Sequence, residues 1–140
     1  MGMSERDEAG KLKNPDAATA QRRNALFHLH KTLLESERAA YEKSIGQITS
    51  PYHFLHLLTH DAWFSWLQPF SQIIAGIDAN LDGKSPPQGA DLDALFKRVR
   101  VLLMPQEGDS GFSGHYHEAI QRDPDVLFAH VQAAQALRQN

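Results

Sequence analysis

Residues 17–43 read AATAQRRNALFHLHKTLLESERAAYEK, a stretch with neither glycine nor proline. At 100° per residue, its apolar side chains gather on one side of a helix, and charged side chains take most of the other side. This pattern predicts a long amphipathic helix. Its apolar side comprises Leu26, Leu29, Leu33, Leu34, Ala40 and Tyr41.

A second helix is predicted from Pro51 to Leu81, because Ser50 is a favourable N-cap and proline is favoured at the first helical position. Its apolar residues cover much more than one stripe, which is typical of a central helix or of a subunit interface. We therefore expect a homodimer that uses part of this helix. Pro69 cannot donate a hydrogen bond to the Ser65 carbonyl, so a kink is expected there.

The second half of the chain predicts a third helix, which Asp91 caps and Pro105 ends, and a fourth helical segment over residues 112–122. Asp123-Pro124 then begins a fresh helix that runs to about Arg138. In this last helix the residues expected to face inward are Val126, Leu127, Val131, Ala134 and Leu137.

Together these segments predict an all-α fold, a four-helix up-down-up-down bundle whose fourth helix is broken or kinked. No strand pattern with a period of two residues appears. Residues 15–140 are expected to form a single helical-bundle domain. Residues 1–14 are mostly polar and are expected to form a disordered leader, and residues 82–89 are expected to form a linker.

The composition excludes several classes of function. With 14 Lys and Arg against 17 Asp and Glu, the formal net charge is -3, so nucleic acid is not an expected partner. The chain has no cysteine, which excludes disulfides and thiolate metal sites. Polar residues interrupt every long apolar stretch, so no membrane segment is expected, and cytoplasmic localisation is the default.

Eight histidines are the unusual feature of the composition, and several of them are expected to collect at one end of the bundle. If the first two helices are antiparallel, positions whose numbers sum to about 94 lie at the same height, so Glu37 is level with Leu57. His56 and His60 are four residues apart, a spacing that lets two imidazoles bind one ion. Glu37 lies near the centre of an apolar arc, where a carboxylate needs a partner.

The fourth segment begins at the same end of the bundle, which brings His115, His117 and Glu118 near this height. We therefore predict a site for a divalent metal, Zn, Ni, Fe or Mn, in a histidine-rich pocket. Its candidate ligands are Glu37, His56 and His60, with His115 or His117 as a further ligand or a general base. Such an ion would activate water or polarise a small-molecule ligand.

A second interpretation needs no metal: Glu37 could accept a hydrogen bond from a histidine of the neighbouring helix. The chain would then be a non-enzymatic interaction or dimerisation module whose histidines are structural or sense pH. His30, central on the first helix, and His130, among apolar residues of the last helix, are interpreted as structural.

The stretch from His56 to Leu67, HLLTHDAWFSWL, resembles the second helix of the DinB/YfiT-like metalloenzymes, in which a histidine precedes an aromatic-rich run. The whole chain also resembles short bacterial helical-bundle proteins. The family's usual pattern has one histidine on helix two and a His-xxx-His pair on the last main helix. Here the pair is on helix two, and the fourth segment has His115-Tyr116-His117. The resemblance implies a divalent metal, often a dimer, and thiol-dependent transferase or hydrolase-type chemistry.

Overall fold

The computed structural model describes residues 17–82, 91–105 and 111–138. Within these ranges every regular element is helical and no strand occurs, which confirms the predicted all-α class. The expected leader and most of the expected linker lie outside the described residues. The elements are α1 (Ala17–Ser44), α2 (Pro51–His60), the 3₁₀ helix η1 (Ala62–Leu67), α3 (Gln68–Leu81), α4 (Leu92–Leu103), α5 (Phe112–Arg122) and α6 (Pro124–Arg138).

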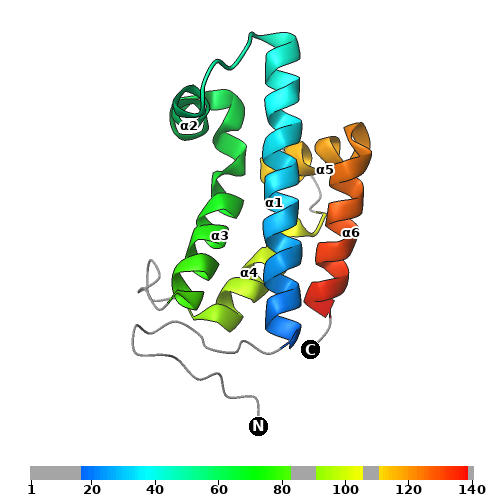
Figure 1. Ribbon diagram of the computed structural model, residues 1–140. Coiled ribbons are helices and arrows are strands. Elements are labelled where there is room, and N and C mark those ends of the chain that lie inside the picture. The colour runs from blue at the N-terminus through cyan, green and yellow to red at the C-terminus, as the bar shows by residue number, and fades with distance from the viewer. Residues whose placement is uncertain (1–16, 83–90, 106–110, 139–140) are drawn as a thin grey trace.

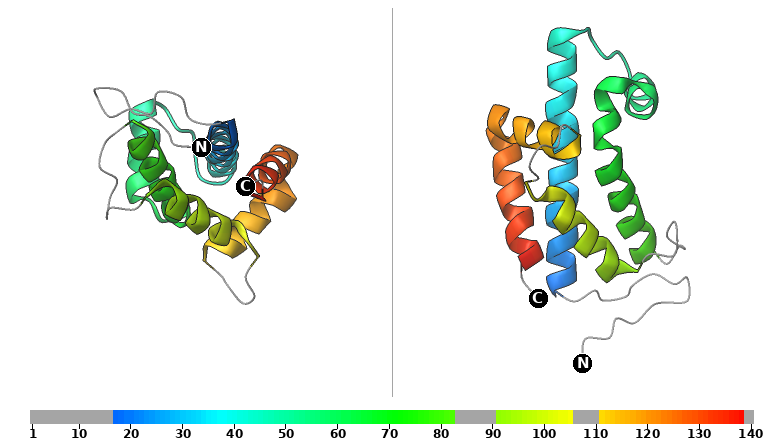
Figure 2. Two further views of the ribbon diagram at one scale, coloured as in Figure 1. Left: turned by 90° about the horizontal axis from the view of Figure 1, so that it is seen from below. Right: turned by 180° about the vertical axis from the view of Figure 1, so that it is seen from behind.

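The long helix α1 stands between α3 and α6 (Figure 1). Its most extensive contact is with α6. The view from behind shows α5 crossing α1 at mid height and α4 running obliquely between α3 and α6 (Figure 2). The helix α2 projects to the side of the upper part of the molecule (Figure 1).

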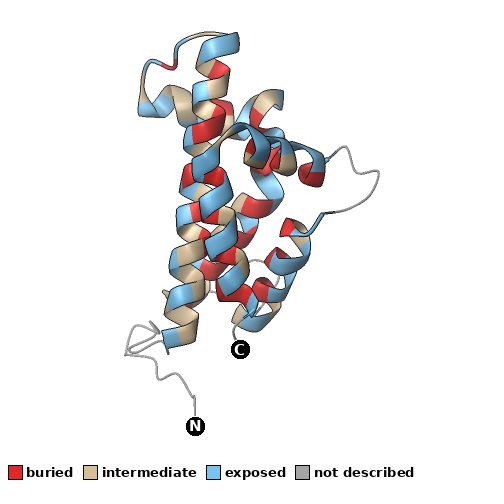
Figure 3. Cartoon of the chain, turned by 90° about the vertical axis from the view of Figure 1, so that its right-hand side faces the viewer, coloured by how far each residue is buried: buried red, intermediate tan, exposed pale blue. Residues whose placement is uncertain are grey.

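The core follows the predicted apolar side of α1. Leu26, Leu29 and Leu33 have no exposed surface, and Tyr41 is also buried. The buried faces of the other helices turn toward this stripe (Figure 3). Because burial of apolar surface drives folding, this cluster fixes the positions of the helices around α1. It is completed by Phe64, Phe70, Ile77, Val99, Tyr116 and Val126, all fully or almost fully buried.

The predicted single helix over residues 51–81 is wrong, because the chain leaves the α-helical conformation at Asp61, where φ is -91° and ψ is 137°. The Asp61 carboxylate accepts a hydrogen bond from the backbone N–H of Trp63 at 2.8 Å and so caps η1. Pro69 does not kink a helix, as it lies in the first turn of α3, where its missing N–H costs nothing. The predicted start is confirmed, since Ser50 caps α2 through the N–H of His53.

The predicted break at Asp123-Pro124 is confirmed: α5 ends at Arg122 and α6 begins at Pro124. The helices described are therefore six α-helices and one 3₁₀ helix, where four rods were expected within these residue ranges. The predicted N-cap at Asp91 is also confirmed, because its carboxylate accepts from the N–H of Ala94 at 2.7 Å.

The predicted inward face of α6 is partly wrong. Val126 and Leu137 are buried as expected, but Leu127 and Val131 are 43% and 42% exposed. The buried face instead consists largely of alanines, at positions 129, 133 and 136. Small side chains let two helix backbones approach closely, so this face suits the extensive contact with α1.

None of the described helices is both long enough and apolar enough to cross a lipid bilayer.

Replacing Ala133, which has no exposed surface, with leucine is expected to force α6 away from its neighbours. We expect a loss of about 1–3 kcal/mol in the free energy of unfolding, measured by urea denaturation. The matched control is Gln132→Leu, which adds a leucine at the exposed neighbouring position and is expected to change stability by less than about 0.5 kcal/mol. Equal losses in the two variants would contradict close packing at this face.

Candidate functional site

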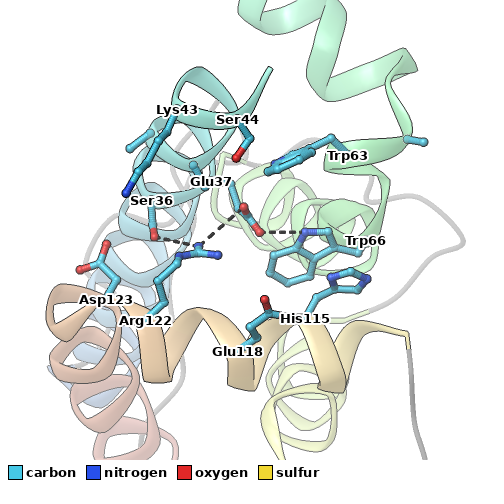
Figure 4. Close-up of a pocket in the computed structure, with 13 residues that line it drawn as sticks. Ser36, Glu37, Lys43, Ser44, Trp63, Trp66, His115, Glu118, Arg122 and Asp123 are labelled. Atoms are coloured by element: carbon cyan, nitrogen blue, oxygen red, sulfur yellow. Dashed lines mark hydrogen bonds and ion pairs between the residues drawn. The ribbon is translucent and has the colours of Figure 1, made fainter. Parts of the chain in front are cut away.

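Glu37 is a buried carboxylate in the upper half of α1, with 5% of its surface exposed. The indole Nε1 of Trp66, from η1, donates a hydrogen bond to Glu37 Oε1 at 3.0 Å. Arg122 Nη2, from the end of α5, lies 3.6 Å from Glu37 Oε2 (Figure 4). The prediction that Glu37 is buried and partnered is therefore confirmed, but neither of these two partners is a histidine.

Arg122 connects the same site to a second residue of α1. Its guanidinium donates to the hydroxyl of Ser36 at 3.1 Å while it faces Glu37 (Figure 4). One charged group thus binds two adjacent residues of α1. Together with the Trp66 indole, it ties α1, η1 and α5 to one another through buried or half-buried polar contacts.

Burial raises the pKa of the Glu37 carboxyl, and this effect outweighs its other interactions. The Arg122 charge, the indole N–H groups and His115 act in the opposite direction, because each favours the charged carboxylate. A carboxyl group with a raised pKa takes up a proton more readily than an exposed one. Such groups are characteristic of binding and catalytic sites.

Aromatic rings surround this carboxylate. The imidazole of His115, from α5, stacks on the Trp66 indole with ring centroids 5.4 Å apart and planes inclined by 18°. Trp63 lies above the carboxylate in the close-up view and packs edge-on against Tyr41 at 5.7 Å (Figure 4). The break at Asp61 is what gives η1 its own direction, so that both tryptophans reach this site.

These residues line a pocket of about 690 Å³ between α1, η1 and α5. Its walls combine apolar surface with a small number of charged groups (Figure 4). The lining residues are Ser36, Glu37, Ala39, Ala40, Lys43, Ser44, Ala62, Trp63, Trp66, His115, Glu118, Arg122 and Asp123.

Of the five predicted metal ligands, Glu37 and His115 line this pocket. His56 and His60 do not line it; they are exposed on α2, with their rings stacked at 4.6 Å. The residues described include no group of three or more histidine, aspartate or glutamate side chains placed to hold one metal ion. Equal heights required the helix after Pro51 to run antiparallel beside α1, but α2 projects to the side and ends at His60 (Figure 1).

The fifth predicted ligand, His117, lies on another side of α5, beside Tyr116 and His130. Its Nε2 is buried without a hydrogen-bond partner among the described residues. The Tyr116 hydroxyl and His130 Nδ1 are 2.7 Å apart, and burial and the neighbouring His117 lower the pKa of His130. His30 is half-buried and hydrogen-bonded to the Ser71 hydroxyl, which agrees with the structural role expected for it.

Three residues of the pocket, Ser36, Lys43 and Arg122, were not predicted from the sequence. Trp66 follows the apolar pattern of a core residue, and this pattern does not reveal that its Nε1–H donates to Glu37. The sequence position of Arg122 does indicate a partner for Glu37. Arg122 is a cation immediately before the Asp123-Pro124 helix start, at the end of the bundle where Glu37 requires a partner.

Comparisons of the chain with protein-family models, with curated proteins and with solved structures found no match. The function is therefore inferred from the geometry and chemistry of the site itself.

The variant Glu37→Gln tests the balance between burial and ion pairing at this site. Because burial raises the pKa, the folded protein holds this proton more tightly than the unfolded chain. The wild type should therefore lose stability relative to the variant as pH rises from about 4.5 through the higher folded pKa. Urea denaturation of both proteins between about pH 4 and 8 measures the difference in their free energies of unfolding. The contributions of the other titrating groups largely cancel in this difference. If the wild type instead gains stability relative to Glu37→Gln as pH rises over this range, the effect of the Arg122 charge on the pKa of Glu37 outweighs the effect of burial.

Proposed function

We propose that this chain binds a small organic molecule in the pocket between α1, η1 and α5. The observation that carries the proposal is the buried Glu37 carboxylate at the wall of a cavity of about 690 Å³. Small-molecule sites are typically clefts of roughly 300–1,000 Å³ with largely apolar walls and a few convergent polar groups. Two indoles and several alanines supply the apolar surface here, and Glu37, Arg122 and His115 supply polar groups.

The arrangement also suits a binding site because its polar groups are held in place before a ligand arrives. Trp66 Nε1–H holds one oxygen of Glu37, and Arg122 is held by both Glu37 and Ser36. Groups fixed in this way lose little conformational freedom on binding, which leaves more of the interaction energy for affinity. Glu37 and His115 are the candidate proton-transfer groups if the bound molecule also reacts.

The two tryptophans of the chain, Trp63 and Trp66, both line the pocket, so intrinsic fluorescence reports on it without a label. We expect some members of a library of cationic, neutral and anionic small molecules to raise the melting temperature and change this emission. Ala40→Leu narrows the pocket and is expected to weaken binding by about tenfold or more. The control Ala17→Leu, at an exposed position of the same helix, should bind like the wild type.

Two results would overturn the proposal. One is a library in which no compound changes either the melting temperature or the tryptophan emission. The other is binding that Ala40→Leu and Ala17→Leu affect equally, because the ligand would then lie outside the pocket.

Divalent metal binding is the second candidate, favoured by the presence of Glu37 and His115 in one pocket. Water molecules or a ligand would have to complete the coordination of such an ion. The implied relation to the DinB/YfiT-like family stays a prediction, as do the cytoplasmic location and the up-down-up-down arrangement of a four-helix bundle with a broken fourth helix.

Elemental analysis of protein purified without a histidine tag tests the metal. If an ion occupies the pocket, near-stoichiometric metal should be lost in both Glu37→Gln and His115→Ala, and EDTA should lower the melting temperature. The variant His56→Ala is a control, because His56 does not line the pocket. Loss of the metal in His56→Ala alone would place the ion on α2, and metal-free protein that is insensitive to EDTA would exclude this candidate.

The expected homodimer also stays a prediction. The helix α2 supports it because Tyr52 and Leu55 are 86% and 58% exposed. Large apolar side chains that lie near one another on a surface are typical of contact sites between proteins. Under the alternative function, an interaction module, this helix is the candidate interface, and the exposed His56 and His60 would be the groups that respond to pH.

A further inference from the structure

The charged groups of the pocket are unevenly distributed. In the close-up view, two cations and one carboxylate lie toward one side, namely Lys43, Arg122 and Asp123 (Figure 4). Glu37 and Glu118 lie toward the other side. Apart from Arg122, which also faces Glu37, this second side has no permanently cationic side chain among the described lining residues.

The two carboxylates differ in how far the protein satisfies them. Trp66 and Arg122 contact Glu37, yet burial still raises its pKa, so these contacts do not fully compensate its desolvation. Glu118 is an exposed residue of α5 that lines the pocket, and its side chain makes no hydrogen bond or ion pair with any other described residue. A cation in the space between them would interact favourably with both.

The indole of Trp63 adds a second attraction for positive charge. Trp63 is half-buried and lines the same side of the pocket as the two carboxylates (Figure 4). Trp66 instead presents its Nε1–H edge to Glu37, and its ring stacks on His115. The face of an indole carries partial negative charge and attracts ammonium groups more strongly than the other aromatic side chains do. Carboxylates combined with aromatic walls are a typical environment for organic ammonium ions.

We propose that the ligand of this pocket is a small organic cation, an amine or quaternary ammonium compound, whose charge lies between the Trp63 indole and the carboxylates of Glu37 and Glu118. This inference rests on the proposed function, because it names the chemical class of the molecule bound. An organic cation also fits the size of the pocket better than a bare metal ion does, since the cavity of about 690 Å³ leaves room for an apolar body beside the charge.

The test uses three probes that share a phenyl ring and a short chain: phenethylammonium, 2-phenylethanol and phenylacetate. Tryptophan emission of the full chain is titrated with each probe at low ionic strength. We expect the cation to bind about tenfold more tightly than the neutral alcohol, and the anion to bind most weakly. Raising the salt concentration should weaken the binding of the cation and leave the alcohol unchanged.

The variant Glu118→Gln separates the charge of the pocket from its shape, and because residue 118 is exposed, the change is expected to leave the stability of the fold unaltered. It should weaken cation binding by about threefold or more without changing the affinity for the alcohol. The matched control is Glu35→Gln, which removes the same charge from an exposed position of α1 that does not line the pocket. This control should bind the cation like the wild type.

Equal or tighter binding of the alcohol or of phenylacetate would overturn the cation inference and leave the proposed small-molecule site intact. Equal effects of Glu118→Gln and Glu35→Gln would also overturn it, because the cation would then respond only to net charge. If neither these probes nor the library changes the tryptophan emission, the cation inference and the proposed function both fail.

Discussion

The burial of one carboxylate, that of Glu37, governs the arrangement of the upper half of this molecule. A carboxylate on the apolar side of a helix is costly unless other groups compensate its lost hydration. Here the compensation comes from an indole N–H of η1 and a guanidinium of α5, two elements far apart in the sequence. The same contacts that satisfy Glu37 therefore hold three helices together and create the pocket between them.

The pocket depends equally on the break in the chain at Asp61. A continuous helix from Pro51 to Leu81 would have carried Trp63 and Trp66 on the stripes expected for the core. Instead, Asp61 caps a short 3₁₀ helix, whose tighter winding changes the directions of the side chains that it carries. Trp66 can then pack in the core, donate to Glu37 and stack on His115 at the same time. Structure and candidate function thus share the same residues.

Local signals predicted most of the helix boundaries correctly. Ser50, Asp91 and the Asp123-Pro124 pair act through hydrogen bonds to nearby backbone N–H groups, so their effect does not depend on the rest of the fold. Asp61 is a residue of the same kind, but the apolar pattern on both sides of it favoured a continuous helix, and the break was missed. The metal-site prediction relied on the helix after Pro51 running beside α1, but α2 projects to the side, so His56 and His60 lie away from the Glu37 pocket.

The sequence alone determined the all-α class, the positions of most helix ends and the need of Glu37 for a partner. These properties depend on hydrophobic period, capping and desolvation, which act over a few residues or on one side chain. Only the tertiary structure decided that the partners are Trp66 and Arg122, and that His115 joins them while His117 lies near His130. Those contacts depend on the rotation and height of each helix, which the packing of the whole core sets.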